Sequence, residues 1–181
     1  MVSSCMSVIV MTNTSKGVLE QDYGIPSDKI EVIAHGTHLV STNKKTFLKE
    51  KYNLTGRKVL TTFGLISSGK SIETTLDALP AIVKANPEVM FLAIGKTHPG
   101  VVKAEGEIYR QMLEAKVTIL NLGDHVRFVN QYLELPVLLE YLRLTDIYLF
   151  TSKDPNQAVS GTFSYAMSCG CPIISTPIPQ A

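Results

Sequence analysis

The chain has 181 residues, the length of one ordinary domain or of one domain with part of another. It is 45% hydrophobic and 18% charged, a composition that supports a sizeable core and argues against disorder. Because 17 basic and 16 acidic residues leave a net charge of +1, no global field attracts nucleic acid, and phosphate must bind at a local site.

In chain order, the first forty residues predict a small unit of their own. Residues 7–11 and 30–33 predict strands, and residues 15–23 predict a helix that is capped by Thr14 or Asn13 and stopped by Gly24. A polar stretch at 37–43 is typical of a linker. We expect residues 1–40 to be the end of a preceding domain with its linker, because the main sheet does not need them.

From residue 44 onward, strands and helices alternate regularly. Apolar runs predict strands at 58–63, 89–94, 125–129, 147–150 and 172–175. Apolar residues at helical spacing predict helices over 44–52, 71–85, 105–120, 136–144 and 161–168, with a loop at 96–102 and a kink or restart at Pro80. Strands this apolar belong to a parallel sheet that is covered on both faces. The predicted fold is α/β, a Rossmann-like, doubly wound sheet over residues 41–181, truncated after its last strand.

The cysteines and the amino-terminal segment indicate a cytoplasmic protein. Cys5, Cys169 and Cys171 are odd in number, and the last two stand too close for an ordinary zinc pair. We therefore expect free thiols in a reducing compartment and no metal site. The first ten residues lack the basic start of a signal peptide, and no apolar run approaches membrane-spanning length.

The loop after the first strand of the predicted sheet has the composition of a phosphate site. Residues 64–71 read GLISSGKS, so the strand ends at Gly64, and Gly69 and Lys70 lead into a helix near Ser71. Backbone amides, the positive end of a helix dipole and an ammonium would surround one point there. The same letters fit the P-loop of nucleoside triphosphatases, so two enzyme classes compete for these residues.

The other strand ends favour one class over the other. Ligands of doubly wound sheets bind at the carboxyl ends of the strands, and we expect Gly64, Gly95, Asn130 and the loop after Phe150 to surround one crevice. A P-loop enzyme needs an acidic residue at the end of a neighbouring strand to hold magnesium, and none of these ends is acidic. Asp146 lies at the opposite end of its strand, so the triphosphatase is the weaker hypothesis.

Several segments, in this order, resemble the nucleotide-sugar glycosyltransferases of family 4 (group 1), which have the two-domain GT-B architecture. Residues 30–36 (IEVIAHG) resemble the "hVIPHGV" start of the second domain, and residues 62–71 (TFGLISSGKS) resemble "hGRLxxxKG". Residues 165–175 (YAMSCGCPIIS) resemble "EAMAxGxPVIAS", the most specific of these blocks. Further matches lie at 91–95, 124–129 and 145–150.

The resemblance implies that the chain is the carboxy-terminal, donor-binding half of such an enzyme, preceded by the end of the acceptor-binding half. It implies hexosyl transfer, with retention of configuration, from a nucleoside-diphosphate sugar to an acceptor. Neither a metal nor a cofactor is implied, since protein cations and helix N-termini neutralise the leaving diphosphate. The full enzyme would associate peripherally with a membrane. Without its acceptor half, we expect this chain to bind nucleotide but to transfer no sugar.

The family's functional residues are only partly present in this sequence. Its phosphate-binding lysine falls on Lys70, but the companion arginine falls on Leu65. The two glutamates of its Glu-x7-Glu motif, which contact the transferred sugar and the ribose, fall on Gln157 and Tyr165. Gln157 can still hydrogen-bond a sugar hydroxyl, and Asp154 is a nearby substitute acid. These departures make a nucleotide-binding domain without catalysis a third hypothesis.

Two residues are therefore predicted to be catalytic, Lys70 and Gln157, and a larger set to bind the donor: Gly64, Gly69, Lys70, Asn130, Asp154, Ser160, Gly161, Thr162 and Tyr165. Ser160, Gly161 and Thr162 open the last long helix, where they either face a phosphate or simply cap the helix. Asn130 follows a strand end where the family's backbone meets the nucleobase, or it belongs to a plain loop. Arg110 is interpreted as a surface or helix-packing residue.

Overall fold

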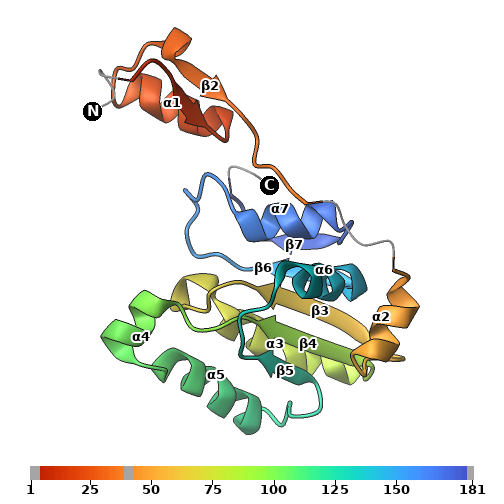
Figure 1. Cartoon of the computed structure of the whole chain (residues 1–181). Coiled ribbons are helices and arrows are strands. Elements are labelled where there is room, and N and C mark those ends of the chain that lie inside the picture. Colours follow the sequence, from red (N-terminus) through yellow and green to blue (C-terminus); the bar gives the residue numbers. More distant parts are fainter. Residues whose placement is uncertain (1–4, 39–42, 179–181) are drawn as a thin grey trace.

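The strands of the computed structural model, which describes residues 5–38 and 43–178, form two separate sheets (Figure 1). In the smaller sheet, β1 (Val8–Val10) pairs in parallel with β2 (Ile30–Val32), and α1 (Asn13–Gln21) and a 3₁₀ turn (Ser27–Lys29) connect them. The larger sheet has five parallel strands in the order β5-β4-β3-β6-β7. These strands are β3 (Lys58–Phe63), β4 (Val89–Ile94), β5 (Val126–Val129), β6 (Ile147–Phe150) and β7 (Ile173–Ser175).

Helices cover both faces of the larger sheet (Figure 1). They are α2 (Lys45–Lys51), α3 (Ile72–Ala85), α4 (Pro99–Glu105), α5 (Ile108–Ile119), α6 (Leu135–Leu144) and α7 (Gly161–Ser168). The alternation along β4 shows why two layers are needed: Met90 and Leu92 pack with α2, α6 and α7, while Phe91 and Ala93 pack with α3 and α5. The predicted doubly wound α/β fold is confirmed.

The strand order places a topological switch at the centre of this sheet. From β3 the chain adds β4 and β5 on one side, and it then returns to add β6 and β7 on the other side. The loops that follow β3 and β6 therefore leave neighbouring strands at the same carboxyl edge. In sheets of this kind, ligands bind at such a point.

A few local predictions differ from the structure. The predicted loop at 96–102 is wrong in its second half, because Pro99 starts α4 and the His98 ring accepts a hydrogen bond from Gly100 N. Thr12, rather than Thr14 or Asn13, caps α1. Pro80 lies inside an uninterrupted α3, so no restart occurs. The predicted linker at 37–43 lies partly outside the described residues, and the division of the chain at residue 40 stays a prediction.

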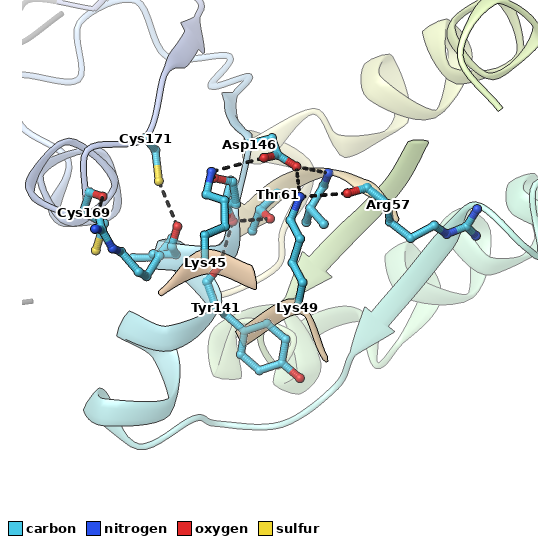
Figure 2. A network of polar contacts seen from close by, with 12 residues as sticks. Lys45, Lys49, Arg57, Thr61, Tyr141, Asp146, Cys169 and Cys171 are labelled. Atoms are coloured by element: carbon cyan, nitrogen blue, oxygen red, sulfur yellow. Dashed lines mark hydrogen bonds and ion pairs between the residues drawn. The ribbon is translucent and has the colours of Figure 1, made fainter. Parts of the chain in front are cut away.

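At the amino-terminal edge of the sheet, Asp146 joins α2 to the strands (Figure 2). Its carboxylate accepts hydrogen bonds from Lys49 Nζ at 2.5 Å, from Lys45 Nζ at 3.1 Å and from Val59 N at 2.7 Å. Burial by itself would raise the pKa of Asp146, but the three donors more than offset it, so that the pKa is lowered.

Among the described residues, no helix combines the length and the apolar character needed to cross a bilayer.

We expect Asp146→Ala to lower the free energy of unfolding by about 2–4 kcal/mol, because it leaves Lys49, with only 15% of its side chain exposed, without this carboxylate. A lowered pKa in the folded state stabilises the protein above the unfolded carboxyl pKa of about 4, and this contribution disappears as pH falls through the folded pKa. The difference between wild type and variant should therefore narrow below about pH 4 in urea titrations.

Asp77→Ala is the matched control, because the Asp77 carboxylate pairs with Lys116 but is 60% exposed. Its loss should cost less than about 1 kcal/mol. An Asp146→Ala loss no larger than that of the control would contradict the structural role of Asp146.

Candidate functional site

The first component of the site is the end of β3, where two strand-end glycines bring backbone atoms unusually close. Gly64 and Gly95 both have positive φ, +127° and +131°. A Cβ atom on Gly95 would lie 2.1 Å from the carbonyl oxygen of Gly64, far closer than any Cβ atom can approach an oxygen. A Cβ on Gly64 would lie 2.9 Å from Lys70 Nζ and 3.1 Å from Thr162 Cγ2. The Lys70 ammonium therefore lies directly against the strand end and close to the first turn of α7.

The Lys70 ammonium has no counter-charge among the described residues. Its side chain forms no hydrogen bond or ion pair with them, although its carbonyl oxygen accepts one from Thr151 Oγ1 at 2.6 Å. Desolvation by burial lowers the pKa of Lys70, and none of the described carboxylates forms an ion pair with it that would offset this effect. An anion bound at this point would relieve the electrostatic cost of a partly desolvated cation.

The loop after β6 fixes the backbone on which Lys70 stands. Lys153 N donates a hydrogen bond to Gly69 O at 2.9 Å, and Lys153 Nζ reaches Glu73 at 2.7 Å in the first turn of α3. Burial would raise the pKa of Glu73, but hydrogen bonds from Lys153 and Tyr109 lower it overall. The two loops at the topological switch are thus joined by direct contacts.

The arrangement of this loop is unlike that of a P-loop. The turn Ser68–Lys70 is a 3₁₀ helix in which Lys70 N donates to Ser67 O and Ser71 N donates to Ser68 O. The Ser71 hydroxyl bonds to that of Thr74 at 2.8 Å. The Lys70 and Ser71 amides and the Ser71 hydroxyl, which a P-loop would offer to a triphosphate and its magnesium, are therefore already engaged.

Next to Lys70 lies a hollow of about 250 Å³ that we call the polar hollow; it is lined by Thr62, Ser67, Gly69, Lys70, Tyr148, Leu149, Phe150, Thr151, Ser152, Asp154 and Gln157. The Gln157 amide accepts from Ser152 Oγ at 3.0 Å and donates to Val159 O at 3.3 Å. Asp154 is exposed, and one of its oxygens accepts from Asn156 N at 2.9 Å. Tyr148 is fully buried, which raises its pKa to about 12. Hydroxyls and amides in this number suit a polyhydroxylated ligand.

On the other side of Gly64 lies a second hollow of about 470 Å³, here called the aromatic pocket; it is lined by His38, Phe63, Gly64, Leu65, Ile94, Gly95, Lys96, Gln131, Tyr132, Leu133, Leu135, Leu138, Thr162 and Tyr165. The Tyr165 ring stacks on His38 with centroids 5.5 Å apart, and its hydroxyl lies 3.1 Å from His38 Nε2. Such a pocket suits a flat, partly apolar ligand.

Most of the predicted site residues meet at this edge. Gly69, Lys70, Asp154 and Gln157 line the polar hollow, and Gly64, Thr162 and Tyr165 line the aromatic pocket. Ser160 and Gly161 line neither hollow. The Ser160 hydroxyl caps α7 by accepting from Phe163 N at 3.3 Å, while Gly161 packs against His35.

Asn130 does not join the crevice, contrary to the sequence prediction. It lines a separate surface hollow with Arg110, whose guanidinium donates to the Asn130 amide oxygen. Arg110 is only 7% exposed and also donates to Gly95 O at 2.8 Å and to Thr97 Oγ1 at 3.1 Å. It thereby supports the Gly95 strand end. Its place on the apolar face of a predicted helix was the available signal for this role.

Within the described part of the chain, no group of three or more His, Cys, Asp or Glu side chains is arranged to hold a metal ion.

Comparison with known proteins then identifies the family. The family described as glycosyl transferases group 1 matches residues 57–181, well over half of the chain. The chain belongs to the group 1 glycosyltransferases. No curated protein sequence matches it significantly.

Solved structures of glycosyltransferases share the fold of this group 1 chain. HepE of Anabaena, solved with UDP, superposes with a TM-score of 0.78 at 21% identity over 97% of this chain and 46% of its own. A glycosyltransferase of Rickettsia africae gives 0.76 at 19% identity, covering 97% and 45%. The C-terminal domain of LpcC from Francisella tularensis gives 0.65 at 18% identity, covering 78% and 69%. The chain thus spans just under half the length of the first two.

We expect Gly95→Ala to destabilise the protein by at least about 2 kcal/mol, because the new methyl group would collide with Gly64 O at a φ that L-residues rarely adopt. Gly123→Ala is the matched control, since it has open space around its Cβ position and no positive φ. Equal unfolding midpoints of the two variants in guanidinium titrations would show that the two strand ends are not held as described.

Proposed function

We propose that this chain is the donor-binding half of a glycosyltransferase that transfers a hexose from a nucleoside-diphosphate sugar, with retention and without a metal ion. The observation that carries the proposal is the desolvated Lys70 ammonium, which lacks a counter-charge among the described residues and lies between a polar and an aromatic hollow. The structures of HepE with UDP and with UDP-glucose support a nucleotide sugar as the ligand. Retention and a hexosyl donor rest on the resemblance to family 4.

In this proposal the diphosphate binds at Lys70, the sugar in the polar hollow and the nucleoside in the aromatic pocket. As the glycosidic bond to the diphosphate breaks, negative charge grows on the leaving oxygen, and the Lys70 ammonium stabilises it. Backbone amides in the first turn of α7, at Gly161 and Thr162, add the positive end of the helix dipole. The Gln157 amide orients the sugar through its hydroxyls.

The acceptor would bind to a further domain. The unit formed by β1, α1 and β2 corresponds, in this proposal, to the end of that acceptor-binding domain, and the Francisella structure is that of a C-terminal domain alone. We expect the 181-residue chain to bind a nucleoside diphosphate and to transfer no sugar unless it is joined to an acceptor-binding half.

A nucleotide-binding domain without catalysis is the second candidate. It is favoured by the absence of a carboxylate at Gln157 and Tyr165 and by the turn hydrogen bond that engages Asp154. Sugar transfer by the chain, once it is fused to an acceptor-binding domain, would exclude this candidate. Nucleotide binding without transfer in the same fusion would favour it.

We expect the Lys70→Met variant to lose its response to nucleotide sugars while keeping its stability. In a thermal-shift panel of UDP-, GDP- and ADP-sugars, the donor that fits should raise the wild-type melting temperature by about 3 °C or more. The ligand-free variant should melt at the same temperature as wild type or higher, because it no longer buries a charge without a counter-charge.

Lys58→Met is the control, since Lys58 is exposed at the opposite end of the same strand. It should respond to the donor like wild type. A response of Lys70→Met equal to that of the control would refute the placement of the diphosphate.

Metal independence has its own test. Because Lys70 supplies the positive charge, the donor-induced shift should change by less than about 1 °C when magnesium is replaced by EDTA. A shift that disappears in EDTA and returns with magnesium would show that a metal ion carries the diphosphate.

A further inference from the structure

The polar groups of the aromatic pocket are notable for their chemistry. None of its described lining residues is Asp or Glu. The Tyr165 hydroxyl is paired with His38 Nε2, and Thr162 Oγ1 lies 2.9 Å from Ser160 Oγ. Lys96, Gln131 and Tyr132 also line the pocket, but all three are exposed, so their hydrogen bonds to a ligand compete with water. The buried part of the pocket therefore offers no carboxylate that could accept two neighbouring hydroxyls at once.

The walls of the same pocket suit a flat aromatic ligand. Phe63 and Tyr165 lie with ring centroids 6.2 Å apart, and His38 extends the aromatic wall. Leu133, Leu135 and Leu138 add aliphatic surface from α6 and the residues before it. Every nucleobase has a π-face that such walls can contact, whichever sugar carries the base.

We infer that the aromatic pocket binds its nucleotide through the base and the diphosphate and does not read the ribose hydroxyls. The site then accepts ribonucleoside and 2′-deoxyribonucleoside diphosphates with similar affinity. This inference rests on the proposed function and specifies the nucleotide that the same site takes. Its physical basis is that discrimination against a missing hydroxyl requires a buried protein group that is left unpaired when the hydroxyl is absent.

Isothermal titration with three matched pairs tests the inference: UDP and dUDP, GDP and dGDP, ADP and dADP. For the base that binds, the two dissociation constants should agree within about threefold. A 2′-deoxynucleotide that binds at least about tenfold more weakly than its ribonucleotide would overturn the inference and leave the proposed function intact. If none of the six nucleotides binds, the proposed function fails, and this inference fails with it.

Variants of Tyr165 test whether the ribose of the bound nucleotide lies beside this side chain. Tyr165→Glu introduces the missing carboxylate, and it should raise the preference for the ribonucleotide at least about fivefold. Tyr165→Phe keeps the ring and removes the hydroxyl, so it should keep the wild-type ratio of the two dissociation constants. An unchanged ratio in a folded Tyr165→Glu, or a selective loss of the ribonucleotide in Tyr165→Phe, would overturn the assignment. If Tyr165→Glu does not fold, Tyr165→Phe and the matched pairs decide.

Discussion

The Lys70 ammonium lies against the end of β3 without an ion-pair partner among the described residues, and the rest of the site depends on how it is held there. Gly64 leaves room for it, because a Cβ atom at that position would lie 2.9 Å from Lys70 Nζ, and Gly95 in turn allows the close approach of the Gly64 carbonyl oxygen. Two hydrogen bonds from the loop after β6, donated by Lys153 N and by Thr151 Oγ1, fix the turn that carries it. A cation that burial disfavours is retained at the point where ligands of doubly wound sheets bind, as expected of a site that trades stability for binding.

The lysines at the two edges of the sheet differ in whether their charge is paired. At the amino-terminal edge, Lys45 and Lys49 share the carboxylate of Asp146, which also accepts a hydrogen bond from Val59 N (Figure 2). At the carboxyl edge, the Lys70 side chain has no acceptor among the described residues. Paired charges thus stabilise the fold at one edge, and an uncompensated charge is available for an anionic ligand at the other. Because the strands are parallel, their amino-terminal ends lie at one edge of the sheet and their carboxyl ends at the other. The stabilising ion pairs and the uncompensated charge are therefore separated by the length of a strand.

The sequence was most informative for strands that are both apolar in composition and buried in the structure. The bounds of β3, β4 and β6 were predicted to the residue; β4 and β6 are continuous apolar runs, and β3 is a run of apolar residues and threonines that ends at Gly64. The helix α4 was not predicted, because it is only seven residues long, contains a glycine and is largely exposed. Asn130 was expected in the crevice from its place after a strand, but its side chain is held by Arg110, a residue 20 positions away. Such a contact depends on how α5 packs on the sheet, which periodicity cannot specify.

The sequence by itself determined the fold class, the glycosyltransferase resemblance and the loop that carries Lys70, because these depend on local composition and on the order of motifs. It did not determine which side chains share a cavity. Only the tertiary structure separated the polar hollow from the aromatic pocket and paired Tyr165 with His38, 127 positions away. The physical reason is that strand order and helix packing bring these residues together, and both result from burial over the whole sheet rather than from any one segment.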